Sequence, residues 1–464
     1  MADINLHKLP NTIEQAYGPV VITLNDVDED QDIRLLCRIQ DTDENIVGFF
    51  RQPPNQAGYS HFDVSKVLQT KVSSNPDLES TELLQTATDE LFEYRIGFGY
   101  EQNGTNIIVG FFTTPYYAFN GRKEYYTLDW DKKPYSAELG SFTVGGIAQL
   151  YSGNKYKALT DRHYNNVTFA SITDGKPTSA VWNTSEGITK IDIKPNDSYT
   201  LTFLNDYYAT TDSGYTTIQS WTNGLNGFYI QAFNGNTEVL PLTILYNTQG
   251  VGGGPAINQT DTTQPTGEYK AITMQTGDIL TYLTNIDYTH YYVAGWAWSR
   301  NPATNTNKAV ITRTYRFDLV DDCSDYPNIQ VSWTNSFGFR DYFDFSKKNE
   351  YKTDVQRNTY TKTNVSWNQA DYSVTPSLRG EAVYGQSYDK TYLASTRFLS
   401  DAESAYLENL YLSPDVRVRF EGSDEWFPVV LTSNTFNQKT FRNNKLFEHT
   451  IEFKLSNKNP LQSK

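Results

Sequence analysis

The chain has 464 residues, of which 38% are hydrophobic and 14% aromatic, and its formal net charge is −15 at pH 7. An acidic chain without a basic stripe does not suit sequence-specific nucleic-acid binding, because phosphate contacts require clustered Lys and Arg side chains. The aromatic content is too high for a disordered chain, and the length predicts roughly three domains. No apolar run approaches about 18 residues, so we expect no membrane span.

Residues 1–126 are expected to form an antiparallel β-sandwich-like domain. From Ile33 to Gln40 every second residue is apolar, which is the period of a half-buried strand. The pairs Asn103-Gly104 and Asn120-Gly121 predict tight hairpin turns, because both residue types tolerate positive φ. A short helix is also expected over residues 83–92.

Residues 127–262 are expected to form a second β-sandwich-like domain. Apolar and polar residues alternate over 199–204 and again over 228–232, and the second stretch runs into the turn pair Asn234-Gly235. The glycine-rich run at 250–255 then predicts a flexible linker or a long loop.

Residues 263–464 are expected to form an α+β domain. Ser400 and Glu403 have the spacing of a capping box, apolar residues follow at helical intervals, and Pro414 should end the helix. Strands are then expected over 416–420, 426–431 and 447–455. The fold class is therefore mainly β, with tandem antiparallel β-sandwich-like domains followed by an α+β C-terminal domain.

No motif for catalysis, cofactor binding or metal binding stands out. The four aspartates between positions 26 and 32 lack the glycine and glutamate that an EF-hand places at its sixth and twelfth positions. Cys37 and Cys323 lie far apart and are interpreted as buried free thiols. We therefore expect a protein without enzyme activity, cofactors or metal ligands.

Aromatic residues are the best candidates for functional positions, because they anchor both protein cores and protein interfaces. Two tryptophans spaced two apart share a face of a strand, which suits either a sugar-stacking surface or a buried contact. We expect a core or subunit contact. The candidate residues are Trp296, Trp298, Trp333, Phe337, Phe339, Tyr342 and Phe343.

Three stretches of the chain resemble a known group of proteins. They are 51–69, with Arg51-Gln52-Pro53-Pro54-Asn55, then 323–360, and finally the capped helix with the strands that follow it. In this order they resemble a poorly characterised family of virion proteins encoded by tailed bacteriophages of Bacteroidetes hosts. The similarity is weakest over residues 130–195, and its motifs are structural, so it carries over no active-site residues.

The resemblance implies a structural subunit that forms or decorates a ring in the tail, baseplate or neck of a virion. Its partners would be further copies of itself in a cyclic homo-oligomer and other tail proteins, and it would be made in the host cytoplasm. The alternative is a receptor-binding or carbohydrate-binding protein at the tail tip, with a host-surface glycan as its ligand.

Overall fold

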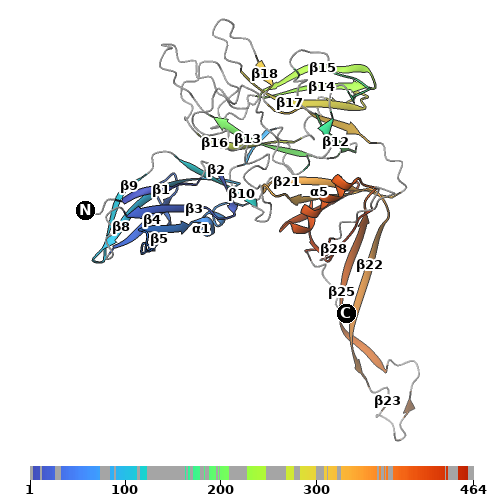
Figure 1. Cartoon of the computed structure of the whole chain (residues 1–464). Coiled ribbons are helices and arrows are strands. Elements are labelled where there is room, and N and C mark those ends of the chain that lie inside the picture. Colours follow the sequence, from blue (N-terminus) through green and yellow to red (C-terminus); the bar gives the residue numbers. More distant parts are fainter. Residues whose placement is uncertain are drawn as a thin grey trace. The chain divides into compact units, whose positions relative to one another are not determined.

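A computed structural model shows the mainly β fold that the sequence predicts (Figure 1). It divides into two compact units, residues 1–321 with 334–341, and residues 322–333 with 342–464. The structure describes residues 4–10, 13–26, 33–73, 84–87, 90–111, 115–122, 162, 166–167, 171–177, 182, 188–194, 197, 199–207, 227–246, 268–275, 283–298, 308–310, 312–320, 326–362, 365–366, 370, 373–374, 380–433, 435–436 and 448–457.

The first unit begins with two sheets that enclose one core. The smaller sheet has the strand order β1 (Ile4–Lys8), β3 (Val21–Asp26) and β6 (Tyr59–Asp63). The larger sheet has the order β2 (Ile13–Tyr17), β10 (Tyr116–Arg122), β8 (Leu91–Gln102), β4 (Ile33–Gln40) and β5 (Ile46–Gln52), with β9 (Thr105–Phe111) also paired to β8. The short helix α1 (Ser65–Gln69) follows β6.

The core of this sandwich explains the alternating pattern in the sequence. Ile22 and Leu24 of β3 and Leu35 and Cys37 of β4 are fully buried in one hydrophobic cluster, because successive side chains of a strand point to opposite faces. Leu68 of α1 joins the same cluster. Burial raises the pKa of the Cys37 thiol to about 12, so the thiol stays protonated and unreactive.

Two of the sequence predictions in this region are wrong. The described part of residues 83–92 contains no helix; it consists of β7 (Leu84–Ala87), Glu90 and the start of β8. Asn120-Gly121 is not a turn but part of β10, which pairs on one side with β8 and on the other with β2. The turn at Asn103-Gly104 is confirmed: it joins β8 to β9, with φ of 51° and 77° at the two residues.

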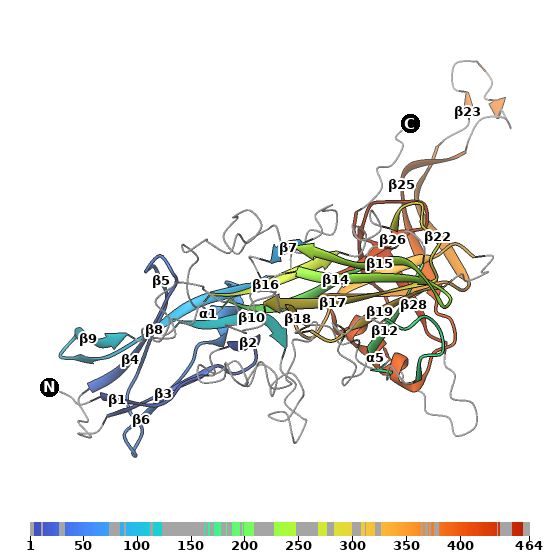
Figure 2. The same cartoon turned by 90° about the horizontal axis from the view of Figure 1, so that it is seen from above.

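A second pair of sheets completes the first unit. The smaller sheet has the strand order β13 (Thr200–Tyr207), β16 (Glu268–Gln275) and β7. The larger sheet has a main order of six strands, and a further strand, β18 (Lys308–Val310), pairs with one of them, β17. That main order is β11 (Asn166–Val167), β12 (Ile188–Ile193), β19 (Tyr315–Leu319), β17 (His290–Trp298), β14 (Gly227–Asn234) and β15 (Thr237–Tyr246). Figure 2 shows β15, β14 and β17 side by side. Phe203 of β13 packs on Phe228 and Tyr315 of the larger sheet, at 5.7 Å between ring centroids.

Strand pairing crosses both positions at which the sequence predicted domain boundaries. β7 lies before residue 126 and pairs with β16, which lies after residue 262. β14, before residue 262, pairs with β17 after it. The predicted hairpin at Asn234-Gly235 is present between β14 and β15, with φ of 56° at Gly235. The glycine-rich run at 250–255, Cys323 and the aspartates at 28, 30 and 32 lie outside the described residues.

Among its described residues, the second unit contains a seven-stranded sheet, a separate two-stranded pair and one α-helix, as expected for an α+β domain. The sheet order is β21 (Arg340–Phe345), β20 (Ile329–Thr334), β26 (Val416–Phe420), β27 (Phe427–Leu431), β28 (Thr450–Leu455), β25 (Glu381–Ser395) and β22 (Asn349–Thr361). Helix α5 (Asp401–Leu412) begins with the predicted capping box: Ser400 Oγ accepts from the Glu403 amide, and the Glu403 carboxylate accepts from the Ser400 amide. Tyr406, Leu407 and Leu410 are its main buried apolar residues.

Candidate interaction surface

Strands β22 and β25 form a long hairpin that leaves the sheet of the second unit. They pair with each other along their whole length, from Asn349–Ala394 to Thr361–Glu381. β28 pairs with β25 only at residues 392–395, so among the described strands the rest of β25 has backbone pairing with β22 alone. Figure 1 shows the two strands running on beyond their sheet, towards the small pair β23 (Val365–Ser366) and β24 (Ser373–Val374). We call residues 349–361 and 381–395 the arm.

Large side chains lie in solvent along the arm. Tyr351 and Tyr384 are 69% and 70% exposed, and Val355, Tyr360 and Val383 are exposed as well. An isolated two-stranded hairpin is only marginally stable in water, and long exposed edges with apolar side chains tend to pair with another chain. The arm therefore presents both large side chains and an unpaired backbone edge to solvent among the described residues.

Charged side chains of both signs alternate along β22. Lys352 Nζ lies 2.9 Å from Asp354 Oδ1, and Lys348 pairs with Glu350. Across the hairpin, Asp354 lies directly opposite Asp389 of β25. Each of these aspartates has a cation within its own chain, because Lys454 Nζ of β28 lies 3.5 Å from Asp389 Oδ2. The arm therefore presents its charges to solvent as ion pairs.

The predicted aromatic residues of the second unit lie in its core. Trp333 is fully buried, with its ring 5.1 Å from that of Tyr406 on α5, and Phe343 packs on the same tyrosine. Tyr342 packs on Trp426 at 5.8 Å. Trp333 and Phe343 thus hold the helix against the sheet through Tyr406.

The other predicted aromatic residues are divided between buried and undescribed positions. Phe337 and Phe339, which belong to the first unit, are buried in the turn between β20 and β21. That turn is held by Asn335, whose side-chain oxygen accepts hydrogen bonds from both of their backbone amides at 3.0 Å. The side chains of Trp296 and Trp298 lie outside the described residues, although their backbones belong to β17.

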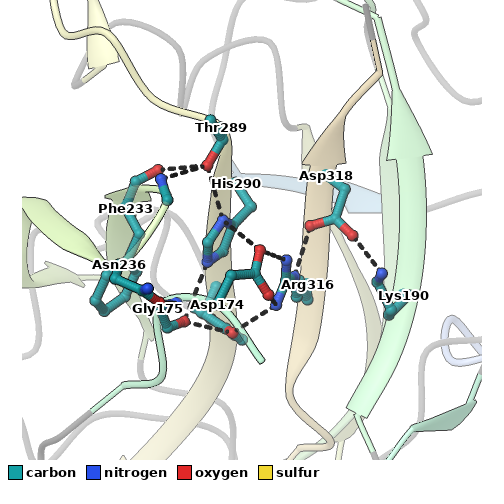
Figure 3. Close-up of polar contacts among 11 residues, drawn as sticks. Asp174, Gly175, Lys190, Phe233, Asn236, Thr289, His290, Arg316 and Asp318 are labelled. Carbon is teal, nitrogen blue, oxygen red and sulfur yellow. Dashed lines mark hydrogen bonds and ion pairs between the residues drawn. The ribbon is translucent and has the colours of Figure 1, made fainter. Parts of the chain in front are cut away.

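A polar cluster in the first unit joins a loop to the sheet of β12, β19 and β17 (Figure 3). Arg316 of β19 is only 4% exposed and donates to both carboxylate oxygens of Asp174, at 2.9 and 2.6 Å. It also donates to Asp318, which in turn pairs with Lys190 of β12 at 2.7 Å. The hydrogen bonds from Arg316 hold the pKa of Asp174 below its ordinary value, so both partners are charged at neutral pH.

His290 lies beside this ion pair and is also engaged on both ring nitrogens. Nδ1 contacts Thr289 Oγ1 at 3.0 Å and Asp174 at 3.6 Å, and Nε2 lies 3.1 Å from the carbonyl oxygen of Gly175. Burial lowers the pKa of His290, which favours the neutral ring. Tyr292 donates to the same carbonyl oxygen at 2.8 Å. The ring thus fastens the Asp174-Gly175 loop, and this geometry supports a structural rather than a catalytic interpretation.

Sequence reasoning missed both the arm and the polar cluster. The Thr, Tyr and Val residues between 351 and 361 favour a strand, but nothing in them indicates that the strand leaves its sheet. Asp174 and Arg316 lie 142 positions apart, so no local motif joins them.

Neither the protein-family models nor the curated proteins contain a match to this sequence. Among the described residues, no three or more His, Cys, Asp or Glu side chains gather as a metal ion would require. None of the described helices is long and apolar enough to cross a membrane.

Proposed function

We propose that the chain is a structural subunit of a bacteriophage virion, which forms or decorates a ring in the tail, baseplate or neck. In this role it has no turnover of its own and acts by contacting its neighbours. The resemblance of residues 51–69 and 323–360 to phage virion proteins supports the location. The arm supports the mode of action.

The exposed arm is the single observation that carries the association role. Its strands present tyrosine and valine side chains to solvent and a backbone edge that no other described strand covers. Aromatic side chains are the usual anchors of protein interfaces, and backbone edges add strands from a partner. In a free monomer the arm would bury little apolar surface. In an assembly it would contact a neighbouring subunit.

The location is tested on virus particles whose genome encodes the chain. The particles are purified, and quantitative mass spectrometry measures how many copies of the chain each one contains. A fixed copy number of several per particle is the expected result. A chain that is abundant in infected cells but missing from purified particles would contradict the virion role.

The association role is tested by shortening the arm. Replacing residues 354–389 by Asn-Gly closes a tight turn between Thr353 and Lys390, which are partners in the hairpin. The matched control replaces only residues 363–379 by Asn-Gly and keeps both long strands, because the Lys362 amide already bonds the Gly380 carbonyl. We expect the short-armed chain to fold but not to enter particles, and the control to enter them normally.

The second candidate function is carbohydrate binding at the tail tip. Tyr351 and Tyr384 are the observation that favours it, because exposed aromatic rings also stack on sugar faces. A glycan array with the purified chain, compared with the variant Tyr351→Ser/Tyr384→Ser, distinguishes the two functions. Binding that the double variant loses would favour the adhesin over the scaffold.

A further inference from the structure

The outer edge of β22 is an unpaired strand edge among the described residues. β22 is the last strand in the order of its sheet, and its thirteen residues contain no proline. Its only irregularity, a bulge between Asn358 and Thr359, leaves residues 349–358 as a regular strand. Such an edge offers a row of amide and carbonyl groups to a second strand.

We propose that β22 pairs with β22 of a second copy of this chain, antiparallel and about a two-fold axis at Thr353. This inference rests on the association role proposed above and names the partner of the arm. Side chains that lie directly opposite each other in a sheet share a face. A two-fold axis therefore places one residue opposite its own copy, and only a few registers are available.

The register centred on Thr353 matches charges over nine opposed residues, 349 to 357. It places Lys352 opposite Asp354 of the partner strand and Asp354 opposite Lys352, which makes two opposite-charge pairs. Centring on Lys352 or Asp354 would place a charge opposite its own copy. Centring on Tyr351 also makes two opposite-charge pairs, Glu350 with Lys352, but it opposes only residues 349–353 of the strand. Centring on Val355 creates neither repulsion nor a charge pair, so Tyr351 and Val355 are the centres of the competing registers.

The same register adds a cation beside Asp354. Asp354 lies between Asp389 on one side, as the hairpin pairing shows, and the incoming Lys352 on the other. Within one chain Asp354 pairs with Lys352 and Asp389 with Lys454, so the partner's Lys352 joins an existing group of ion pairs. On the opposite face, Tyr351 meets Val355 of the second copy, an aromatic with β-branched pair of the kind that stabilises sheets. All opposed residues, 349 to 357, lie before the bulge.

Charge reversal on the full chain tests the pairing directly. Lys352→Asp places aspartates opposite each other, Asp354→Lys places lysines opposite each other, and each should weaken self-association by about tenfold. A mixture of the two variants should recover it, because every opposed pair is then of opposite sign. The ion pair within each chain stays broken in both variants, so recovery cannot come from the single strand. Sedimentation equilibrium measures all three samples.

Disulfide trapping identifies the register. Thr353→Cys places two thiols on opposed residues, about 4.5–5.5 Å apart at Cβ, and should give a cross-linked dimer under mild oxidation. Gln356→Cys is the matched control, because its copies would lie about 20 Å apart along the paired strands. The unmodified chain controls for the two native cysteines.

The outcomes separate this inference from the proposed function. Recovery on mixing, together with cross-linking at position 353 but not 356, supports the pairing. Cross-linking of Val355→Cys instead of Thr353→Cys would overturn the register, and a chain that stays monomeric at all concentrations would overturn the pairing itself. If arm shortening still blocks entry into particles while neither charge variant alters self-association, the arm binds another partner. The inference then fails and the scaffold role stands.

Discussion

Arg316 and Asp174 are 142 positions apart in the sequence, and their side chains meet in a two-pronged ion pair at 2.9 and 2.6 Å. The arginine is almost fully buried, whereas the aspartate is 42% exposed. The pair therefore holds a surface loop against a buried strand.

Replacing Arg316 should lower the free energy of unfolding more than replacing Asp174. Arg316→Met leaves Asp174 without its cation and Asp318 with Lys190 alone, and it should lower the free energy of unfolding by about 3 kcal/mol. Asp174→Asn should cost about 1 kcal/mol, because Arg316 keeps its bond to Asp318. Arg51→Met, which breaks an exposed pair with Glu101, is the control and should cost less than about 1 kcal/mol. Urea unfolding of the full chain measures all three; equal losses would contradict this account.

His290 should make the first unit less stable as the solution becomes acidic. Its folded pKa lies below the ordinary value of 6.5, chiefly because of burial, so the unfolded chain takes up a proton first as the pH falls. Stability is therefore complete above about pH 7 and is lost as the pH drops through 6.5 towards the folded pKa. The pKa of Asp174 is lowered from 3.8, so that carboxylate affects stability only in more acidic solution.

Thermal unfolding between pH 7.5 and 5.5 checks the histidine. His290→Gln should flatten the dependence on pH, since glutamine can still donate to the Gly175 carbonyl and does not titrate. The unaltered chain, measured over the same pH range, is the control. An unchanged slope in the His290 variant would show that another group is responsible.

Gly175 should not tolerate a side chain. A Cβ there would lie 2.5 Å from the carbonyl oxygen of Gly235 and 2.8 Å from Phe233 Cβ, closer than real contacts allow. Gly175→Ala should destabilise the first unit by about 1–3 kcal/mol through this overlap. Gly385→Ala in the arm is the control, since its nearest atom would be 3.7 Å away and the change should stay within about 0.5 kcal/mol. Differential scanning fluorimetry measures the unfolding temperatures of the two variants and of the unaltered chain.

The capping box of α5 should contribute about 1 kcal/mol to the free energy of unfolding. Ser400→Ala removes the oxygen that accepts from the Glu403 amide at 3.3 Å and leaves that donor unpaired. Ser387→Ala, at an exposed position in the arm, is the control and should be neutral. If both variants unfold at the same temperature as the unaltered chain, the cap contributes nothing to the stability of the second unit.

Local signals predicted the elements whose causes are local. The capping box of α5 and the turn at Asn103-Gly104 depend on neighbouring residues alone, and both are present. Residues 83–92 contain apolar spacings that suit a helix or a strand, and pairing of β7 with β16 decides for the strand. Asn120-Gly121 carries a turn signal inside β10. There the glycine is needed for space, because a Cβ would lie 2.4 Å from the Phe119 ring.

The candidate surface depends on information that a sequence does not hold locally. The alternating residues of β22 indicate a strand, but only the order of the sheet shows that its outer edge is uncovered. The carboxylates of Asp354 and Asp389 become neighbours only through the hairpin register. Likewise, the buried aromatic rings around Tyr406 were predictable as core residues, whereas their particular partners were not.

The pairing of β7 with β16 has a consequence for the order of synthesis on the ribosome. β7 ends at Ala87, and its partner strand begins only at Glu268, so its pairing edge must wait for the intervening chain to emerge. At about 5–20 residues per second this delay is on the order of ten seconds or more. By then the described strands of the sandwich built from residues 4–122 have all been synthesised, whereas β7, which belongs to another sheet, still lacks its partner. Nascent chains should therefore expose β7 longest, and a chaperone that recognises extended segments has its best target there.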